Sequence, residues 1–230
     1  NSDKICEIIC HNFEAEKIFE IVAHEVNSKP KNERNLVFID PYGYKDIQPD
    51  TLYSILQNGI TELIVFLPAS FLYRFSKIAQ VETDIVQYEH LRKFILSFFP
   101  PDHPVRRSEE YTIFDFIRFV KERLSYDNNF YSAAHYIQRD QGNYFAIFFI
   151  ASHIYGLEKF LETKWNLDPI SGQGYKMPKR APTLFDNQFE EEDREQSLGW
   201  LAKKLESYIR ERERNNLQVY EFTLRQGYLP

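Results

Sequence analysis

Short apolar runs alternate with amphipathic stretches along the first 70 residues of the chain. Apolar residues follow one another at 36–39 and 63–68, which predicts two buried strands at 35–39 and 62–68. Residues 4–10 alternate and then turn apolar, which predicts a further short strand. Between these runs, apolar residues at three- and four-residue spacing predict helices from residue 13 to the break at residue 28 and from residue 48 to Gly59. Strands alternating with helices in this way are typical of a parallel sheet covered on both faces.

The pattern changes between residues 69 and 141. Two helical stretches rich in aromatic residues, at 88–99 and 111–124, flank a proline-rich loop. Residues 129–137 and 143–153 are both strand-like and predict a hairpin. The remainder predicts a helix at 156–165, a loop at 170–182, a charged helix at 190–215 and a short element at 218–230.

We therefore expect an α/β fold in three parts. Residues 1–79 and 143–170 form the α/β core, and residues 80–142 form an aromatic-rich helical insertion. Residues 183–230 form a helical C-terminal appendage. A chain of 230 residues, 43% of them hydrophobic and 16% aromatic, is long enough to bury a sizeable core in such an arrangement.

Charge, cysteines and termini exclude several classes of protein. The formal net charge of −6 leaves no global basic field for nucleic acid, so any such contact needs local patches. On a strand, Cys6 and Cys10 would lie about 13 Å apart, whereas a disulfide needs Cα atoms within about 7 Å. We expect buried free thiols, and no metal site with the neighbouring His11.

The same features predict where the protein resides. No signal peptide is visible at the start of the sequence. The most apolar window, residues 144–151, is far shorter than the ~20 residues of a membrane helix. We expect a soluble, cytoplasmic protein without a membrane partner. The chain starts with Asn1 and contains one Met, so we expect it to be part of something longer.

The strand at 35–39 ends in Asp40, Pro41, Tyr42 and Gly43, which makes this position the leading candidate site. Ligands of open α/β sheets bind outside the carboxyl ends of the strands. Asp40 at such an end can accept a hydrogen bond from a substrate amine or coordinate a metal; alternatively, its side chain caps the turn. Tyr42 can stack on a planar base or serve as a packing residue.

Two further residues are candidates for the same cleft. Arg74 follows the strand at 62–68 and can bind a phosphate or carboxylate bidentately, or form a surface ion pair. His153 ends the second strand of the predicted hairpin and can reach the cleft or be structural. The sequence carries no metal-ligand spacing, phosphate-binding glycine loop or nucleophile elbow, so it does not favour a hydrolase or nucleotidase.

Taken together, these segments resemble a known family. Residues 38–44, then 63–67 with Arg74, and later 144–153 with Lys164 are similar to the bacterial three-Cys-motif partner proteins. The resemblance covers residues 5–165. The order acid, proline, aromatic is also similar to the Asp-Pro-Pro-Tyr signature of methyltransferases that act on exocyclic amines.

The resemblance implies a Rossmann-like, S-adenosylmethionine-dependent methyltransferase domain whose appendage begins a winged helix. The strand before Asp40 would be the fourth of its sheet. Asp40, Pro41 and Tyr42 would then be catalytic. The cofactor would lie near Asn12 and Phe13, and the substrate near Gly43, Arg74 and His153.

The glycine-rich cofactor loop of the family is absent, so the sequence is expected to start at the third strand of that domain. Two functions are open. The first is a methyltransferase acting on a nucleic-acid base. The second is a catalytically inactive subunit that serves as a scaffold for protein or nucleic acid. The implied partner of the family is a cysteine-motif protein.

Overall fold

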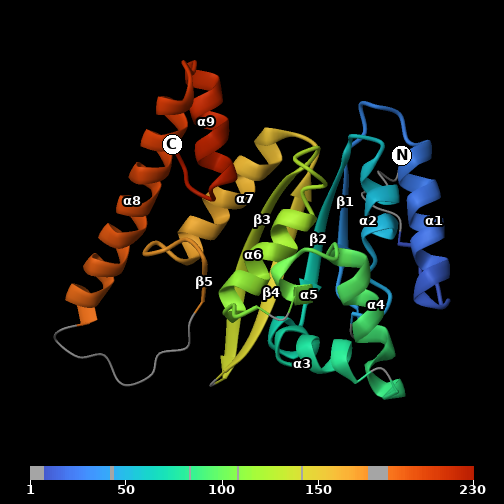
Figure 1. Cartoon of the computed structure of the whole chain (residues 1–230). Helices are drawn as coiled ribbons and strands as arrows, with labels where there is room; N and C mark the ends of the chain where they lie inside the picture. The colour runs from blue at the N-terminus through green and yellow to red at the C-terminus, as the bar shows by residue number, and fades with distance from the viewer. Residues whose placement is uncertain (1–7, 42–43, 83, 108, 141, 176–185) are drawn as a thin grey trace.

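The computed structural model describes residues 8–41, 44–82, 84–107, 109–140, 142–175 and 186–230 (Figure 1). For residues 186–197 it describes the backbone only. Everything below refers to these residues.

A five-stranded sheet forms the centre of the molecule. Its order is β1 (Asn35–Ile39), β2 (Thr61–Leu67), β4 (Asn143–Ala151), β3 (Tyr131–Asp140) and β5 (Gly174–Tyr175). β1 is parallel to β2, β5 is parallel to β3, and β4 is antiparallel to both of its neighbours. Four strands therefore share one direction and β4 alone is reversed. The predicted α/β class with a mostly parallel sheet is confirmed.

Helices flank the sheet on both sides (Figure 1). Their bounds are α1 (Ala15–Ser28), α2 (Pro49–Leu56), α3 (Ala69–Val81), the short 3₁₀ helix η1 (Val86–Tyr88), α4 (Glu89–Phe98), α5 (Pro104–Arg107), α6 (Ile113–Arg123), α7 (Ile154–Leu167), α8 (Asp186–Glu211) and α9 (Asn216–Arg225). α2 begins with Pro49, whose fixed φ suits the first helical turn, and Gly59 follows its end at φ +74°.

The main core lies between one face of the sheet and helices α1 to α6. Alternate residues of β2, including Leu63, Val65 and Leu67, are buried in it because successive side chains of a strand point to opposite faces. A smaller core on the other face joins β3 to α7 and α9 through Leu157, Leu161 and other apolar residues.

The structure corrects the expected domain boundaries. Residues 129–137 and 143–153 do pair as the predicted hairpin, β3 and β4. Because β3 lies in the sheet beside β4, the segment 80–142 is not a separate helical insertion. Its helices α4 and α6 pack into the same core as β2. The boundary at residue 142 therefore does not follow the fold.

The predicted strand at residues 4–10 and the predicted burial of its cysteines are wrong for the residues that the structure describes. Residues 8–10, the described end of the predicted strand 4–10, have no regular structure, and residues 4–7 lie outside the described part. Cys10 is free and exposed, not buried, while Cys6 lies outside the described residues. The predicted loop at 170–182 contains the two-residue strand β5, and its residues 176–182 are outside the described part.

The edge of the sheet formed by β1 is open in the described structure. β1 pairs with β2 on one side, and no described strand pairs with its other side. Leu36 and Phe38 are 63% and 60% exposed on one face of β1. None of the described helices is long and apolar enough to span a membrane.

Candidate functional site

The carboxyl ends of β1 and β2 lie side by side, since Ile39 is in register with Val65. Asp40 follows β1 directly, and α3 begins two residues after the end of β2. The reversed direction of β4 brings the turn between β3 and β4 to the same edge, because Leu67 pairs with Ala146. The segment after β1, the segment between β2 and α3, and the turn between β3 and β4 therefore all lie at this edge of the sheet.

Asp40 is exposed, and its carboxylate forms no ion pair with a described residue. Pro41 is half-buried. Tyr42 and Gly43 lie outside the described residues, so the predicted stacking of Tyr42 and contact of Gly43 stay predictions. The Asp40 side chain, the leading candidate from the sequence, is thus accessible to solvent at the carboxyl edge of the sheet.

The chain after Gly43 is anchored by Tyr44. Its ring lies edge-on to Phe94 at 5.8 Å between centroids and tilted against Phe71 at 5.5 Å. Burial raises the pKa of the Tyr44 hydroxyl. Ile47, three residues further on, is completely buried. These contacts fix the far end of the loop that starts at Asp40.

Arg74 lies at this edge, but its guanidinium contacts the turn between β3 and β4. Its Nη2 donates to the carbonyl oxygen of Gly142 at 3.1 Å and to Oδ1 of Asn143. Ser70 strengthens the same connection, because its hydroxyl donates to Gly142 O at 3.0 Å and accepts from Tyr144 N at 2.7 Å. Arg74 therefore positions the turn, and it is neither buried nor part of an ion pair among the described residues.

Asn12 and Phe13 also lie toward this edge. The last turn of α1 contacts the last turn of α2, with Asn27 donating to Ser54 O and Asn58 donating to Val26 O. Since α2 ends at the amino edge of β2, α1 must begin near the carboxyl edge. Phe13 is 58% exposed, and neither residue lines a described cavity.

A hollow of about 370 Å³ opens between α1, α2 and the loop after Tyr44. Glu16, Phe19 and Glu20 line it from α1, and Lys45 and Gln48 line it from the loop. It is mixed in polarity, and Lys45 in its lining follows Asp40 closely in the sequence.

His153 does not reach the site, contrary to the expectation from sequence. It follows β4, whose last residue Ala151 pairs with Glu62 near the start of β2. That is the opposite edge of the sheet from Asp40. There His153 is the N-cap of α7, and its Nδ1 accepts the backbone N–H of Tyr155 at 3.1 Å.

Sequence reasoning missed a second group of polar residues beside β3. Lys164 of α7 is only 7% exposed, and burial, together with the nearby charge of Lys121, lowers its pKa to about 7. Burial also lowers the pKa of Lys121 on α6. A signal existed, because Leu157, Leu161 and Lys164 share one helical stripe and both leucines are buried.

No group of acidic, histidine and cysteine side chains in the described residues has the geometry of a metal site. Comparison with known proteins gave no significant match to any protein-family model, curated protein or solved structure.

Proposed function

We propose that this chain belongs to an S-adenosylmethionine-dependent methyltransferase that acts on the exocyclic amine of a nucleic-acid base. The observation that supports this proposal is the position of Asp40. It is an exposed carboxylate at the carboxyl end of β1, beside a second parallel strand, where open α/β sheets bind their ligands. A sheet in which only one strand is reversed is compatible with a Rossmann-like methyltransferase domain.

In this proposal, the residues that follow β1 orient the substrate amine and base for methyl transfer. The Asp40 carboxylate and the carbonyl oxygen of Pro41 accept hydrogen bonds from the amine and direct its lone pair at the methyl donor. Tyr42 stacks on the base, which must leave a duplex to reach the site. Arg74 holds the neighbouring turn in place through Gly142.

The cofactor site is not complete in the described residues. Asn12 and Phe13 are exposed and line no described cavity. When bound, S-adenosylmethionine would supply the methyl group. Strands that could complete its site would pair with the open edge of β1, next to Asp40.

A second function, a binding scaffold without catalysis, is favoured by the same open edge. Leu36 and Phe38 expose more than half of their surface on β1, and exposed apolar strand edges readily pair with another chain. A protein partner, for which the family resemblance suggests a cysteine-motif protein, would cover them.

Methyl transfer from labelled S-adenosylmethionine to single-stranded oligonucleotides tests the first function. The Asp40→Asn variant should lose at least tenfold in rate at unchanged thermal stability. Asp50→Asn is the matched control, since Asp50 is an exposed acid in the first turn of α2. If the wild type neither binds S-adenosylmethionine nor transfers methyl groups, while it still binds protein or nucleic acid, the scaffold function replaces the enzyme.

A further inference from the structure

A cleft runs along the free edge of β3, away from Asp40. It consists of two adjoining hollows of about 580 and 840 Å³. Both are lined by Lys121 of α6, Ser132 of β3 and Arg225 of α9, and Lys164 lines the larger one. Because β5 pairs only with Tyr136 and the residue after it, the first half of β3 is left open to this cleft.

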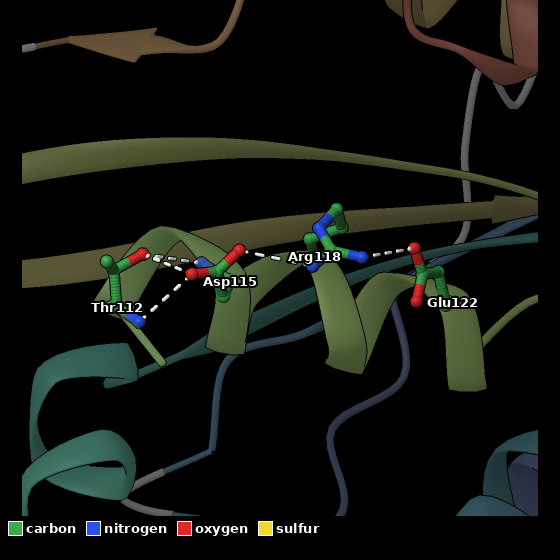
Figure 2. Close-up of polar contacts among 4 residues, drawn as sticks. All are labelled: Thr112, Asp115, Arg118 and Glu122. Atoms are coloured by element: carbon green, nitrogen blue, oxygen red, sulfur yellow. Dashed lines mark hydrogen bonds and ion pairs between the residues drawn. The ribbon is translucent and has the colours of Figure 1, made fainter. Parts of the chain in front are cut away.

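The acidic side chains of α6 in this cleft already have hydrogen-bond or ion-pair partners. Asp115 Oδ2 accepts from the backbone N–H and the hydroxyl of Thr112 at 3.0 and 2.8 Å in a capping box. Arg118 bridges the two acids, with Nη2 3.1 Å from Asp115 Oδ1 and Nη1 3.0 Å from Glu122 Oε1 (Figure 2). Both carboxylates therefore have Arg118 as their ion-pair partner, and Glu122 also attracts Lys121 over a longer distance.

The acidic side chains on the other elements around the cleft also have hydrogen-bond or ion-pair partners. Glu221 of α9 pairs with Arg225 at 2.9 Å and accepts from the Tyr131 hydroxyl at 3.2 Å. Asp168, which follows α7, is held by its own loop, with Oδ2 accepting from the Ser171 hydroxyl at 2.6 Å and from Gly174 N at 3.1 Å. Burial alone would raise the pKa of Asp168, but these loop hydrogen bonds outweigh it and lower the pKa.

Lys121 and Lys164 form no ion pair within the described part of the chain, although Glu122 acts on Lys121 and Asp168 on Lys164 over a longer distance. Among the described side chains, no carboxylate oxygen lies within 4.0 Å of either ammonium group. An ammonium group that is buried without an anionic partner is strongly disfavoured. His135 of β3, beside Lys164, is 5% exposed, and its Nδ1 has no hydrogen-bond partner in the described structure. In the described lining of the cleft, basic side chains outnumber acidic ones: Arg118, Lys121, Lys164, Lys204 and Arg225 against Asp115, Glu122 and Glu221.

We propose that this cleft binds a phosphate monoester group between Lys121 and Lys164. Two unpaired ammonium groups match the double negative charge of a phosphate monoester better than the single charge of a carboxylate. Arg225 and Lys204 line the same cleft, and the Lys204 ammonium lies 5.5 Å from the centroid of the Trp200 ring. The site is independent of Asp40, so it stands whether or not the chain transfers methyl groups.

Binding should draw a proton from solution at pH 8. Lys164 is then mostly neutral, and a phosphate beside it favours the charged form. The other charged or titratable groups around it are Lys121 on α6, His135 on β3, Asp168 after α7 and Arg225 on α9. Among these, Lys121 also has a pKa lowered by burial.

Isothermal titration calorimetry with inorganic phosphate, adenosine 5′-monophosphate and adenosine, in two buffers of different ionisation enthalpy, tests this site. We expect phosphate to bind with proton uptake and adenosine not to bind. If adenosine 5′-monophosphate binds more than tenfold tighter than phosphate, the source is a nucleotide; equal affinities indicate free phosphate.

Lys164→Gln should weaken phosphate binding at least tenfold and reduce the proton uptake. Lys159→Gln is the matched control, because Lys159 lies exposed on the same helix and pairs with Glu162 at 2.7 Å. If Lys164→Gln does not fold, Lys121→Gln tests the proposal in its place, because the Lys121 side chain is only half-buried and its replacement is better tolerated. No phosphate binding by the wild type, or binding that both variants retain, overturns the proposal.

Discussion

Replacing Lys164 by methionine should stabilise the protein at neutral pH. In the folded state the pKa of Lys164 is lowered from 10.5 to about 7, chiefly by burial. One pKa unit corresponds to about 1.4 kcal/mol, so at pH 7 the buried amine costs the folded state on the order of 4 kcal/mol. Methionine fills a similar volume without a charge. After relaxation we expect a gain of about 1–4 kcal/mol in the free energy of unfolding.

The pH dependence gives this prediction its sign. Because the folded-state pKa of Lys164 lies below the unfolded value, the unfolded chain binds more protons between about pH 7 and 10.5. Wild-type stability should therefore rise through this window, with a contribution from Lys164 of about 1.4 kcal/mol per pH unit. The Met variant lacks that contribution, so its advantage should shrink steadily as the pH rises.

Urea titrations at pH 7, 8, 9 and 10, in buffers free of phosphate and sulfate, measure this difference. Lys159→Met is the control, since Lys159 is exposed on the same helix and should leave the pH dependence of stability unchanged. If Lys164→Met has the same pH dependence as the wild type, or is less stable at pH 7, Lys164 is not a buried, unpaired amine.

Three other substitutions address the fold. Ser70→Ala removes the hydroxyl that ties α3 to the turn between β3 and β4, and should lower the free energy of unfolding by about 1–2 kcal/mol in urea; an unchanged midpoint would contradict this role. Gly174→Ala would place a Cβ 2.3 Å from the Tyr136 carbonyl oxygen, so β5 should separate from β3 at a cost of about 1–3 kcal/mol in thermal melts, unlike a change in an open loop. Leu36→Lys combined with Phe38→Lys should change stability by less than about 0.5 kcal/mol and suppress concentration-dependent light scattering; a large loss of stability would show that both side chains are covered.

The strands β1, β2 and β4 are predictable from the sequence because each is a mostly apolar run of strand length, whereas β3 mixes apolar and polar residues. Their pairing was harder to anticipate. The sequence predicts the two strands of the hairpin, but the aromatic helices before Asn143 favour an insertion and hide the place of the first strand in the sheet. Only tertiary pairing, with Phe149 opposite Ala133, shows that β3 completes the sheet.

The candidate site was predictable where strand direction was predictable. Asp40 and Arg74 follow parallel strands, so both lie at the carboxyl edge as expected. His153 follows β4, and the rule that strand ends meet at one edge does not hold for a reversed strand. Lys164 could be placed on a buried stripe by its spacing from Leu161, yet its lack of a counter-ion depends on how α6 and α9 pack around it.

The open edge of β1 bears on the local stability of the site itself. Backbone groups of β1 are bonded on one side only, so its amides should open and exchange more readily than those of β2, which is bonded on both sides. Asp40 directly follows the end of β1. A chain that pairs with β1 would slow amide exchange there and at the same time restrict the motion of Asp40. Binding of a chain to the β1 edge and binding of a ligand to the Asp40 carboxylate would then be thermodynamically linked, without any direct contact between the partner chain and Asp40.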